Sequence, residues 1–170
     1  MKSHYILVLA CLWGFANAHH STGNLAATIR ATQSSILDFL GSPRNAIDGN
    51  ADSSYKMGSC SSTAMQSRPW WKIDFFYHYR VYVVKITASS DGSDANTLNG
   101  AEIRIGDSPE HNGANNALCA KITSMSPGQT KLFYCAPLGV HGRFMSIIVP
   151  ERSGRLALCE VEAYGAHEPH

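Results

Sequence analysis

The chain has 170 residues, of which 44% are hydrophobic and 16% charged, with 14 basic and 13 acidic side chains and a net charge of +1. A neutral chain without runs of like charge gives no electrostatic reason to expect nucleic acid or an anionic membrane as a partner. Its length and hydrophobic content are sufficient for one folded domain with its own core.

The first 18 residues are typical of a secretory signal peptide. Lys2 precedes the apolar run YILVLACLWGFA, and the small residues ANA at 16–18 then match a cleavage site. The run is too short for a membrane span, and no other stretch approaches one, so no membrane insertion is expected. We therefore expect residues 1–18 to be removed, residues 19–23 to form a short extension, and the protein to be secreted and extracellular.

The cysteine count supports the same compartment. Of five cysteines, Cys11 would leave with the signal peptide, and the four that remain are Cys60, Cys119, Cys135 and Cys159. An even number of cysteines in a secreted chain favours disulfide bonds, here two, and spacing alone leaves three pairings open. Because none of the four forms a C-x-x-C pair, a zinc site is not expected.

Alternating and β-branched runs predict strands along most of the remaining chain. The predicted strands are residues 71–76, 79–88, 101–106, 130–136, 143–150 and 156–165. Segments rich in Gly, Asn and Pro separate them, and no stretch has caps and a sustained helical period. The pattern predicts an antiparallel β-sandwich or barrel. Residues 166–170 are expected to form a frayed tail.

The segment NAIDGNADSSYKMGSC, residues 45–60, concentrates oxygen-bearing side chains and glycine. Asp48, Asn50 and Asp52 occupy the first, third and fifth positions of an EF-hand loop. The EF-hand interpretation fails, because Ser53 stands where that loop requires glycine and its twelfth residue is serine instead of glutamate. The supply of oxygen still suits calcium, which takes six to eight oxygen ligands.

A carboxylate from elsewhere in the chain would help to complete such a shell. Glu160 is a candidate, because it follows Cys159. A disulfide between Cys159 and Cys60 would hold Glu160 against Ser59. On spacing alone, the alternative is a solvated turn rich in Asp and Asn.

Six segments together resemble an F-type lectin, the fucolectin family. In chain order they are NLAATIRATQSS, NAIDGNADSSYKMGSC, PWWKIDF, GAEIRIG, SMSPGQTKLFYC and LCEVEAYG. The resemblance extends from Asn24 to Gly165, so residues 24–165 form the expected domain. It implies an all-β, eight-stranded antiparallel jelly roll similar to discoidin-type domains, which agrees with the predicted strands.

The resemblance also implies one structural calcium ion that clamps the loops at one end of the sandwich. The implied ligands are Asn45, Asp48, Asn50, Ser59, Cys159 and Glu160. Asn45, Asn50 and Cys159 would each contribute a backbone oxygen, and Asp48 and Glu160 a carboxylate oxygen. Ser59 would contribute its backbone oxygen and its hydroxyl oxygen. The implied disulfides are Cys60–Cys159 and Cys119–Cys135.

The fucose site of the family is not preserved in this sequence. In the family, a histidine and two basic side chains donate hydrogen bonds to the sugar, and charged donors make the stronger bonds. These positions are Ser62, Ser90 and Thr97 here, and only an acid, Asp91, remains. Because hydrogen bonds to charged groups contribute about 1.5–3 kcal/mol each, we expect weak or no binding of free L-fucose.

The same loops offer a different set of side chains. Tyr55 stands where an aromatic wall would contact the sugar, Met57 adds an apolar platform, and Asp94 is one of two residues that replace the vicinal disulfide of the family. The candidate ligand-binding residues are Tyr55, Met57, Ser62, Ser90, Asp91, Asp94 and Thr97. The alternative interpretation is that they are solvated loop residues.

Two functions fit this sequence. One is a secreted calcium-binding lectin for a glycan or glycoprotein, with an oligomer possible and with a glycan other than simple terminal fucose as ligand. The other is a lectin scaffold recruited to protein or cell-coat recognition, for example in innate immunity or sperm–egg recognition. An enzyme is not expected, because G-x-S-x-G and H-E-x-x-H are absent. His78, His111 and His141 are interpreted as strand-end or loop residues.

Overall fold

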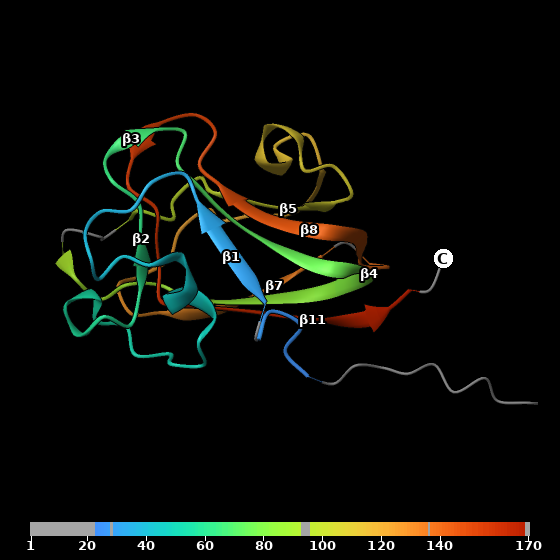
Figure 1. Cartoon of the computed structure of the whole chain (residues 1–170), viewed down its shortest axis with the longest axis horizontal. Coiled ribbons are helices and arrows are strands. Elements are labelled where there is room, and N and C mark those ends of the chain that lie inside the picture. The colour runs from blue at the N-terminus through green and yellow to red at the C-terminus, as the bar shows by residue number, and fades with distance from the viewer. Residues whose placement is uncertain (1–22, 28, 93–95, 136, 169–170) are drawn as a thin grey trace, which may run out of the picture.

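The fold is organised around one strand, β4 (Trp70–Thr87), which runs for 18 residues through the computed structural model. The structure describes residues 23–168 except 28, 93–95 and 136. β4 is rich in β-branched and aromatic residues, which favour a pleated, half-buried surface. It unites two of the predicted strands into one. Figure 1 shows it running between β8 and β5 on one side and β11 on the other.

The two halves of β4 belong to different layers of a β-sandwich. The first half pairs with β1 (Arg30–Gln33) and with β8 (Val140–Ile148), which pairs again with residues 79–81 of β4 past a register shift. β8 pairs in turn with β5 (Glu102–Gly106). The second half pairs with β7 (Thr130–Tyr134) and β11 (Glu160–His167). All of these pairings are antiparallel, which confirms the expected all-β fold.

One hydrophobic core lies between the layers. Trp71, Ile103 and Met145 enter it from the first layer, and Ile86 and Val161 enter it from the second. Inward side chains alternate with outward ones along β5 and the first part of β4, as the pleat requires, whereas the last four residues of β8 are all buried. The alternation in the sequence therefore identifies the core faces of these strands.

Shorter elements complete the fold. β6 (Ala117–Lys121) pairs with β5, and the disulfide Cys119–Cys135 joins β6 to the chain just after β7. Two-residue pairs lie near the loops: β2 (Ser61–Ser62) with β10 (Ala157–Leu158), and β3 (Gln66–Ser67) with β9 (Ser153–Gly154). The described residues form eleven strands where eight were expected, because two-residue pairs carry no readable alternation.

The described residues contain only 3-10 turns as helical structure: η1 (Pro43–Ile47), η2 (Tyr55–Met57) and η4 (Glu110–Gly113). None of them has the length and apolarity needed to cross a membrane. β1 and β6 were not among the predicted strands, since neither sequence alternates clearly.

The C-terminal strand continues past the expected end of the domain. β11 runs to His167, although residues 166–170 were expected to fray. The Glu168 amide then donates a hydrogen bond to the His78 carbonyl at 3.0 Å. The expectation of a frayed tail is therefore wrong for residues 166–168, because backbone pairing with β4 satisfies their polar groups.

The other end of the described chain is also tied to β11. The Asn24 side-chain oxygen accepts a hydrogen bond from the Ala163 amide at 3.0 Å, and the Leu25 amide donates to the Ala163 carbonyl at 2.8 Å. The expected signal peptide at 1–18 lies outside the described residues, as does most of the extension at 19–23.

Replacing Gly142 by alanine tests the packing of β8 against β5. A Cβ at Gly142 would lie 2.4 Å from the Gly106 amide nitrogen, a contact that only a backbone shift relieves. We expect Gly142→Ala to lower the free energy of unfolding by about 1–3 kcal/mol, measured by urea denaturation. Gly92→Ala is the matched control, because a Cβ there meets nothing within 4 Å. Equal stability of the two variants would contradict this packing.

Candidate functional site

The disulfide Cys60–Cys159 fastens the oxygen-rich loop to the first residues of β11. It joins residues 99 apart in the sequence, and it confirms the expected pairing. Next to it, the Cys159 amide donates to the Thr87 carbonyl at 3.0 Å, and the Ser90 amide donates to the Ser53 carbonyl at 2.8 Å. Loops from three distant parts of the chain therefore meet at one end of the sandwich.

Glu160 is a buried carboxylate at the centre of this end. It is 2% exposed, and neither of its oxygens accepts a hydrogen bond of good geometry from the described residues. Burial, together with the nearby charges of Asp48 and Glu162, raises the pKa of Glu160 to about 7, although the Gly49 amide and Lys85 oppose the rise. A buried carboxylate beside a second one is unfavourable unless a cation or a proton joins them.

The remaining expected metal ligands surround the same carboxylate. The Asn50 amide donates to Asp48 Oδ1 at 2.9 Å, and Asn50 Nδ2 donates to Ser59 Oγ at 3.3 Å. Ser59 is buried and precedes the disulfide partner of Cys159. Asp48, Asn50, Ser59 and Glu160 thus lie together, and their oxygen donors fit a hard divalent cation such as calcium.

The side chain of Asn45 supports the loop through hydrogen bonds to backbone carbonyls. Its side-chain amide donates to the Leu40 carbonyl at 2.7 Å and to the Cys60 carbonyl at 3.3 Å. The side chain therefore serves the fold, which is compatible with the expectation that only the backbone oxygen of Asn45 faces a metal.

The structure does not bring the candidate ligand-binding residues together as one open rim. Ser62 has no exposed surface, and its hydroxyl donates to the Thr63 carbonyl at 3.4 Å. Tyr55 is buried, and its hydroxyl donates to Asp38 Oδ1 at 2.5 Å. Thr97 is also buried. A ligand at the surface does not reach the Ser62 hydroxyl in this conformation.

Other members of that set remain accessible. Met57 is 74% exposed, Ser90 is exposed, and Asp91 is half-buried with its carboxylate accepting a hydrogen bond from the Lys56 amide at 3.2 Å. Asp94 lies outside the described residues. The accessible part of the candidate site is therefore small and carries an acid in place of basic donors.

Sequence reasoning missed two arginines at this end of the molecule. Arg152 donates to the Asn99 carbonyl at 3.2 Å and to the Asn96 carbonyl at 3.1 Å. With Arg155, Met65 and Thr97, these residues line a shallow hollow. The signal in the sequence was two arginines three positions apart in the turn before the last strand. They place guanidinium groups close to the loops that lack the family's basic residues.

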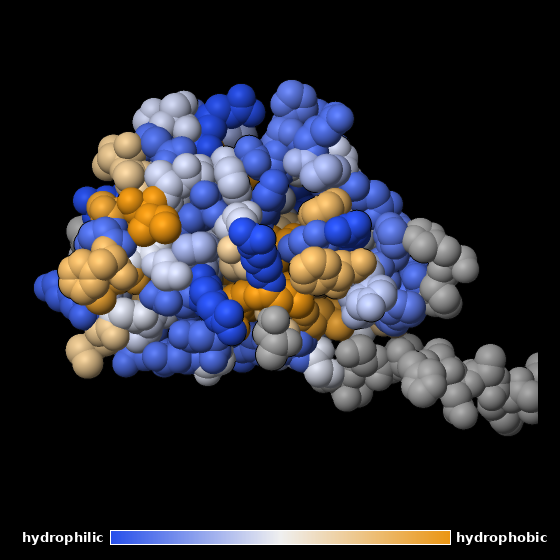
Figure 2. All heavy atoms as spheres, viewed as in Figure 1, coloured by the Kyte–Doolittle hydropathy of each residue, from blue (hydrophilic) through white to orange (hydrophobic). Residues whose placement is uncertain are grey.

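The loop end also exposes large apolar side chains. Phe39 is 92% exposed and Met65 is 69% exposed, and Ile36 and Met57 lie on the same loops with more than half of their surface accessible. Figure 2 shows hydrophobic patches at this end of the molecule, interrupted by hydrophilic residues, and a further hydrophobic group near the middle of the same face. Contiguous apolar surface rimmed by polar residues is typical of a binding surface.

The comparisons with known proteins agree with this architecture. Residues 45–147 match a family model described as the NedA-like, galactose-binding domain. Fucolectin-1 of Anguilla japonica is 41% identical over 143 residues, which are 82% of this chain and 79% of that protein. The match to a fucose-binding module of Streptococcus pneumoniae has a TM-score of 0.69 and 27% identity, and it covers 84% of this chain and 97% of that chain.

A solved fucolectin from the serum of the striped bass, Morone saxatilis, is also similar, with a TM-score of 0.82 and 43% identity. The match covers 88% of this chain and 50% of that chain, so the chain spans about half of the striped bass lectin. These findings define a carbohydrate-binding lectin scaffold. The chain belongs to the fucolectin, or F-type lectin, family. Its relatives are lectins and binding modules, not enzymes.

The pH dependence of the stability of metal-free protein tests whether burial raises the pKa of Glu160. The unfolded chain releases this proton near pH 4.5, whereas the folded chain holds it up to about pH 7. Between these values the folded state binds more protons, so the free energy of unfolding falls as the pH rises. We expect the melting temperature in EDTA to decrease from about pH 5 to about pH 7 and then to level off.

Glu160→Gln is the matched variant for that experiment, because it keeps the shape and removes the titration. Above about pH 7 in EDTA, the melting temperature of this variant should exceed that of the wild type. The corresponding difference in the free energy of unfolding is up to roughly 3 kcal/mol. The same pH dependence in both proteins would show that Glu160 ionises as freely as in water.

Proposed function

We propose that the protein is a secreted, calcium-binding lectin whose ligand is a glycan other than simple terminal fucose. One observation carries this proposal: an F-type lectin scaffold has serine or threonine at all three positions that hold the family's basic donors, and two of these side chains, Ser62 and Thr97, are buried. Free fucose is then bound weakly or not at all.

Calcium belongs to the proposal because of Glu160 and Asp48. The exposed Asp48 carboxylate adds a second negative charge beside the buried Glu160, which makes the charged form of Glu160 costly, and a divalent cation between them would remove that cost. When bound, calcium would neutralise this pair and hold the loop 45–60 against the start of β11. Asn50 and Ser59 would contribute further oxygens, and the loop would then keep one conformation for a ligand.

The glycan site in this proposal lies among the loops at the same end. Arg152 and Arg155 line its hollow, and charged donors of this kind make strong hydrogen bonds to sugar hydroxyls, carboxylates or sulfates. Met65 lines the same hollow, and Met57 adds exposed apolar surface at the loop end. A negatively charged or sulfated glycan fits these groups better than a neutral deoxy sugar.

Secretion is proposed on independent grounds. The chain starts with a segment typical of a signal peptide, and both expected disulfides are present. Disulfides persist in oxidising compartments and are rare in the cytosol.

A specific observation also favours a second function, recognition of a protein or cell coat by the same loops. Phe39 and Met57 are strongly exposed at the loop end, and protein interfaces are enriched in aromatic residues and methionine. A partner protein would cover this apolar surface, which a single sugar would not.

Calcium removal tests the metal proposal. Since the unfolded chain has no formed site, ligand binding to the folded state raises stability by mass action, by about 2.7 kcal/mol at 100 times the dissociation constant. We expect millimolar calcium to raise the melting temperature of the wild type and to leave Asp48→Asn/Glu160→Gln nearly unchanged. An unchanged melting temperature of the wild type in millimolar calcium would contradict the proposed metal site.

A glycan array, read in calcium and in EDTA, tests the ligand. We expect calcium-dependent binding to a defined acidic or sulfated glycan and no titration signal for free L-fucose in the millimolar range. Arg155→Gln should weaken the array signal, whereas Arg104→Gln, on β5 outside the loops, should not. Tight fucose binding would contradict the proposed specificity. A blank array from a calcium-stabilised protein would favour protein recognition instead.

A further inference from the structure

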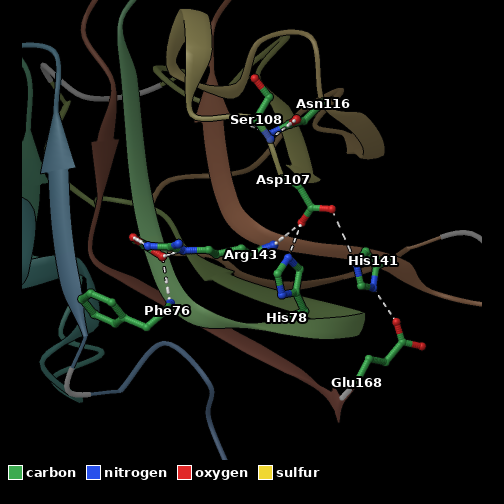
Figure 3. Close-up of polar contacts among 9 residues, drawn as sticks. Phe76, His78, Asp107, Ser108, Asn116, His141, Arg143 and Glu168 are labelled. Carbon is green, nitrogen blue, oxygen red and sulfur yellow. Dashed lines mark hydrogen bonds and ion pairs between the residues drawn. The ribbon is translucent and has the colours of Figure 1, made fainter. Parts of the chain in front are cut away.

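Two histidines and an aspartate converge at the end of the sandwich away from the loops. Figure 3 shows His78, His141 and Asp107 facing one another, from the middle of β4, the start of β8 and the residue that follows β5. His78 Nε2 lies 3.2 Å from Asp107 Oδ1, and His141 Nε2 lies 3.6 Å from Asp107 Oδ2. One ligand atom from each residue lies within 4.8 Å of the other two.

The fold holds His78 in place through an irregularity in β4. Pairing of β4 with β8 shifts register between Asp74 and Tyr79, and Phe76 there has a positive φ of 64°. The Asp74 carboxylate accepts hydrogen bonds from the Phe76 amide at 2.8 Å and from the Arg143 guanidinium. This bulge turns His78 toward Asp107, and bulges commonly re-aim side chains in this way.

Close contact of two strands places the other two residues. Asp107 follows Gly106 and His141 precedes Gly142, and these glycines let the backbones of β5 and β8 meet. The Arg143 amide donates to Asp107 Oδ1 at 3.1 Å, which orients the carboxylate toward the histidines. Each member of the cluster is therefore positioned by backbone features that the core packing maintains.

The two imidazole rings present their Nε2 atoms at the same side. The rings stack with centroids 5.3 Å apart and an angle of 10° between their planes, and both Nε2 atoms face Asp107. Histidine and carboxylate are ligands of zinc and related ions, with bonds of roughly 2.0–2.2 Å. Two ligand atoms on one tetrahedral ion lie roughly 3.3 Å apart, close to the two distances that Asp107 already makes.

Glu168 adds the outer support that metal-binding histidines usually have. Its Oε2 lies 2.5 Å from His141 Nδ1, while its Oε1 pairs with Arg80 Nε. A proton on Nδ1 that is shared with a carboxylate leaves Nε2 as the free ligand atom. Because Arg80 pairs with the other oxygen of Glu168, this carboxylate is held beside His141 Nδ1.

The cationic side chains nearby have other partners. Arg143 binds Asp74 through two contacts of 2.7 Å, and Arg80 binds Glu168. Among the described residues, Asp107 contacts the two histidines and accepts a hydrogen bond from the Arg143 amide. A metal ion bound between the three side chains would therefore meet the negative charge of Asp107 without an arginine or lysine side chain among these contacts.

We infer that His78, His141 and Asp107 form a binding site for a divalent transition-metal ion such as zinc, with Glu168 as a positioning residue for His141. Three protein ligands leave a coordination position open for water or for a donor from a partner. The ion would join β4, β5 and β8, and Glu168 would link it to the end of β11.

The site is separate from the proposed calcium site in place and in chemistry. Glu160 starts β11 and Glu168 follows its end, and an eight-residue strand spans about 23 Å. Calcium takes oxygen ligands, whereas imidazole nitrogen selects zinc, copper or nickel. Failure of the inferred site would therefore leave the lectin and its calcium site untouched.

Zinc titration of the untagged mature protein against a chromophoric chelator, in saturating calcium, tests this inference. We expect one zinc ion per chain. Asp107→Asn and His78→Gln should each weaken binding by at least about tenfold, and Glu168→Gln by about tenfold. His111→Gln and His167→Gln are matched controls, since neither residue belongs to the cluster, and both should bind zinc like the wild type.

Imidazole proton signals identify the ligands directly. Zinc should shift the ring signals of His78 and His141 in the wild type, and at least about tenfold more zinc should be needed for the same shift in Asp107→Asn, which is expected to fold because the Asp107 side chain is exposed. Absence of zinc binding up to the millimolar range would overturn the inference. Equal zinc affinity of Asp107→Asn and the wild type would also overturn it, because zinc would then bind to other histidines.

Discussion

The ion pair between Asp74 and Arg143 holds the bulge of β4, which lies between the two stretches of this strand that pair with β8. Two hydrogen bonds of 2.7 Å join the carboxylate to the guanidinium, and they lower the pKa of Asp74, so the pair persists into acid. The same carboxylate accepts the amide of Phe76, whose positive φ is costly for a side chain of this size. The pair therefore supports the bulge across which β4 remains paired with β8.

The two ends of the sandwich use different chemistry. At the loop end, the disulfide Cys60–Cys159 and the buried Glu160 join segments far apart in the sequence. At the opposite end, imidazole and carboxylate groups meet at the surface, where water still reaches Asp107. The hydrophobic core between them carries the stability, so each end can diverge without loss of the fold.

Most of the fold could be predicted from the sequence, because the alternation of Trp71, Ile73 and Phe75 or of Ile103 and Ile105 is a local signal of a half-buried strand. The disulfide pairing came from the family resemblance, since cysteine spacing alone left three choices. The continuity of β4 was missed, because the bulge at Phe76 looks like a break when only the sequence is read.

The site was harder to predict than the fold. The oxygen-bearing side chains around Asp48 and Asn50 lie close together in the sequence, so this part of the site could be predicted from the sequence alone. The burial of Ser62 depends on its pairing with Ala157, and no local pattern contains that information. His78, Asp107 and His141 lie in three separate segments of the chain, and only the register of β4, β5 and β8 brings them together.

Both ends of the described chain run along β11, with Asn24 bonded to Ala163 and Glu168 bonded to His78. In Figure 1 the loops with η2 and β2 lie on the other side of the molecule. A domain of this kind can be joined in series to a neighbour, before or after it, without covering its loops. The geometry therefore suits tandem or fused arrangements, in which several copies present their loops in one direction and bind a repetitive surface by avidity.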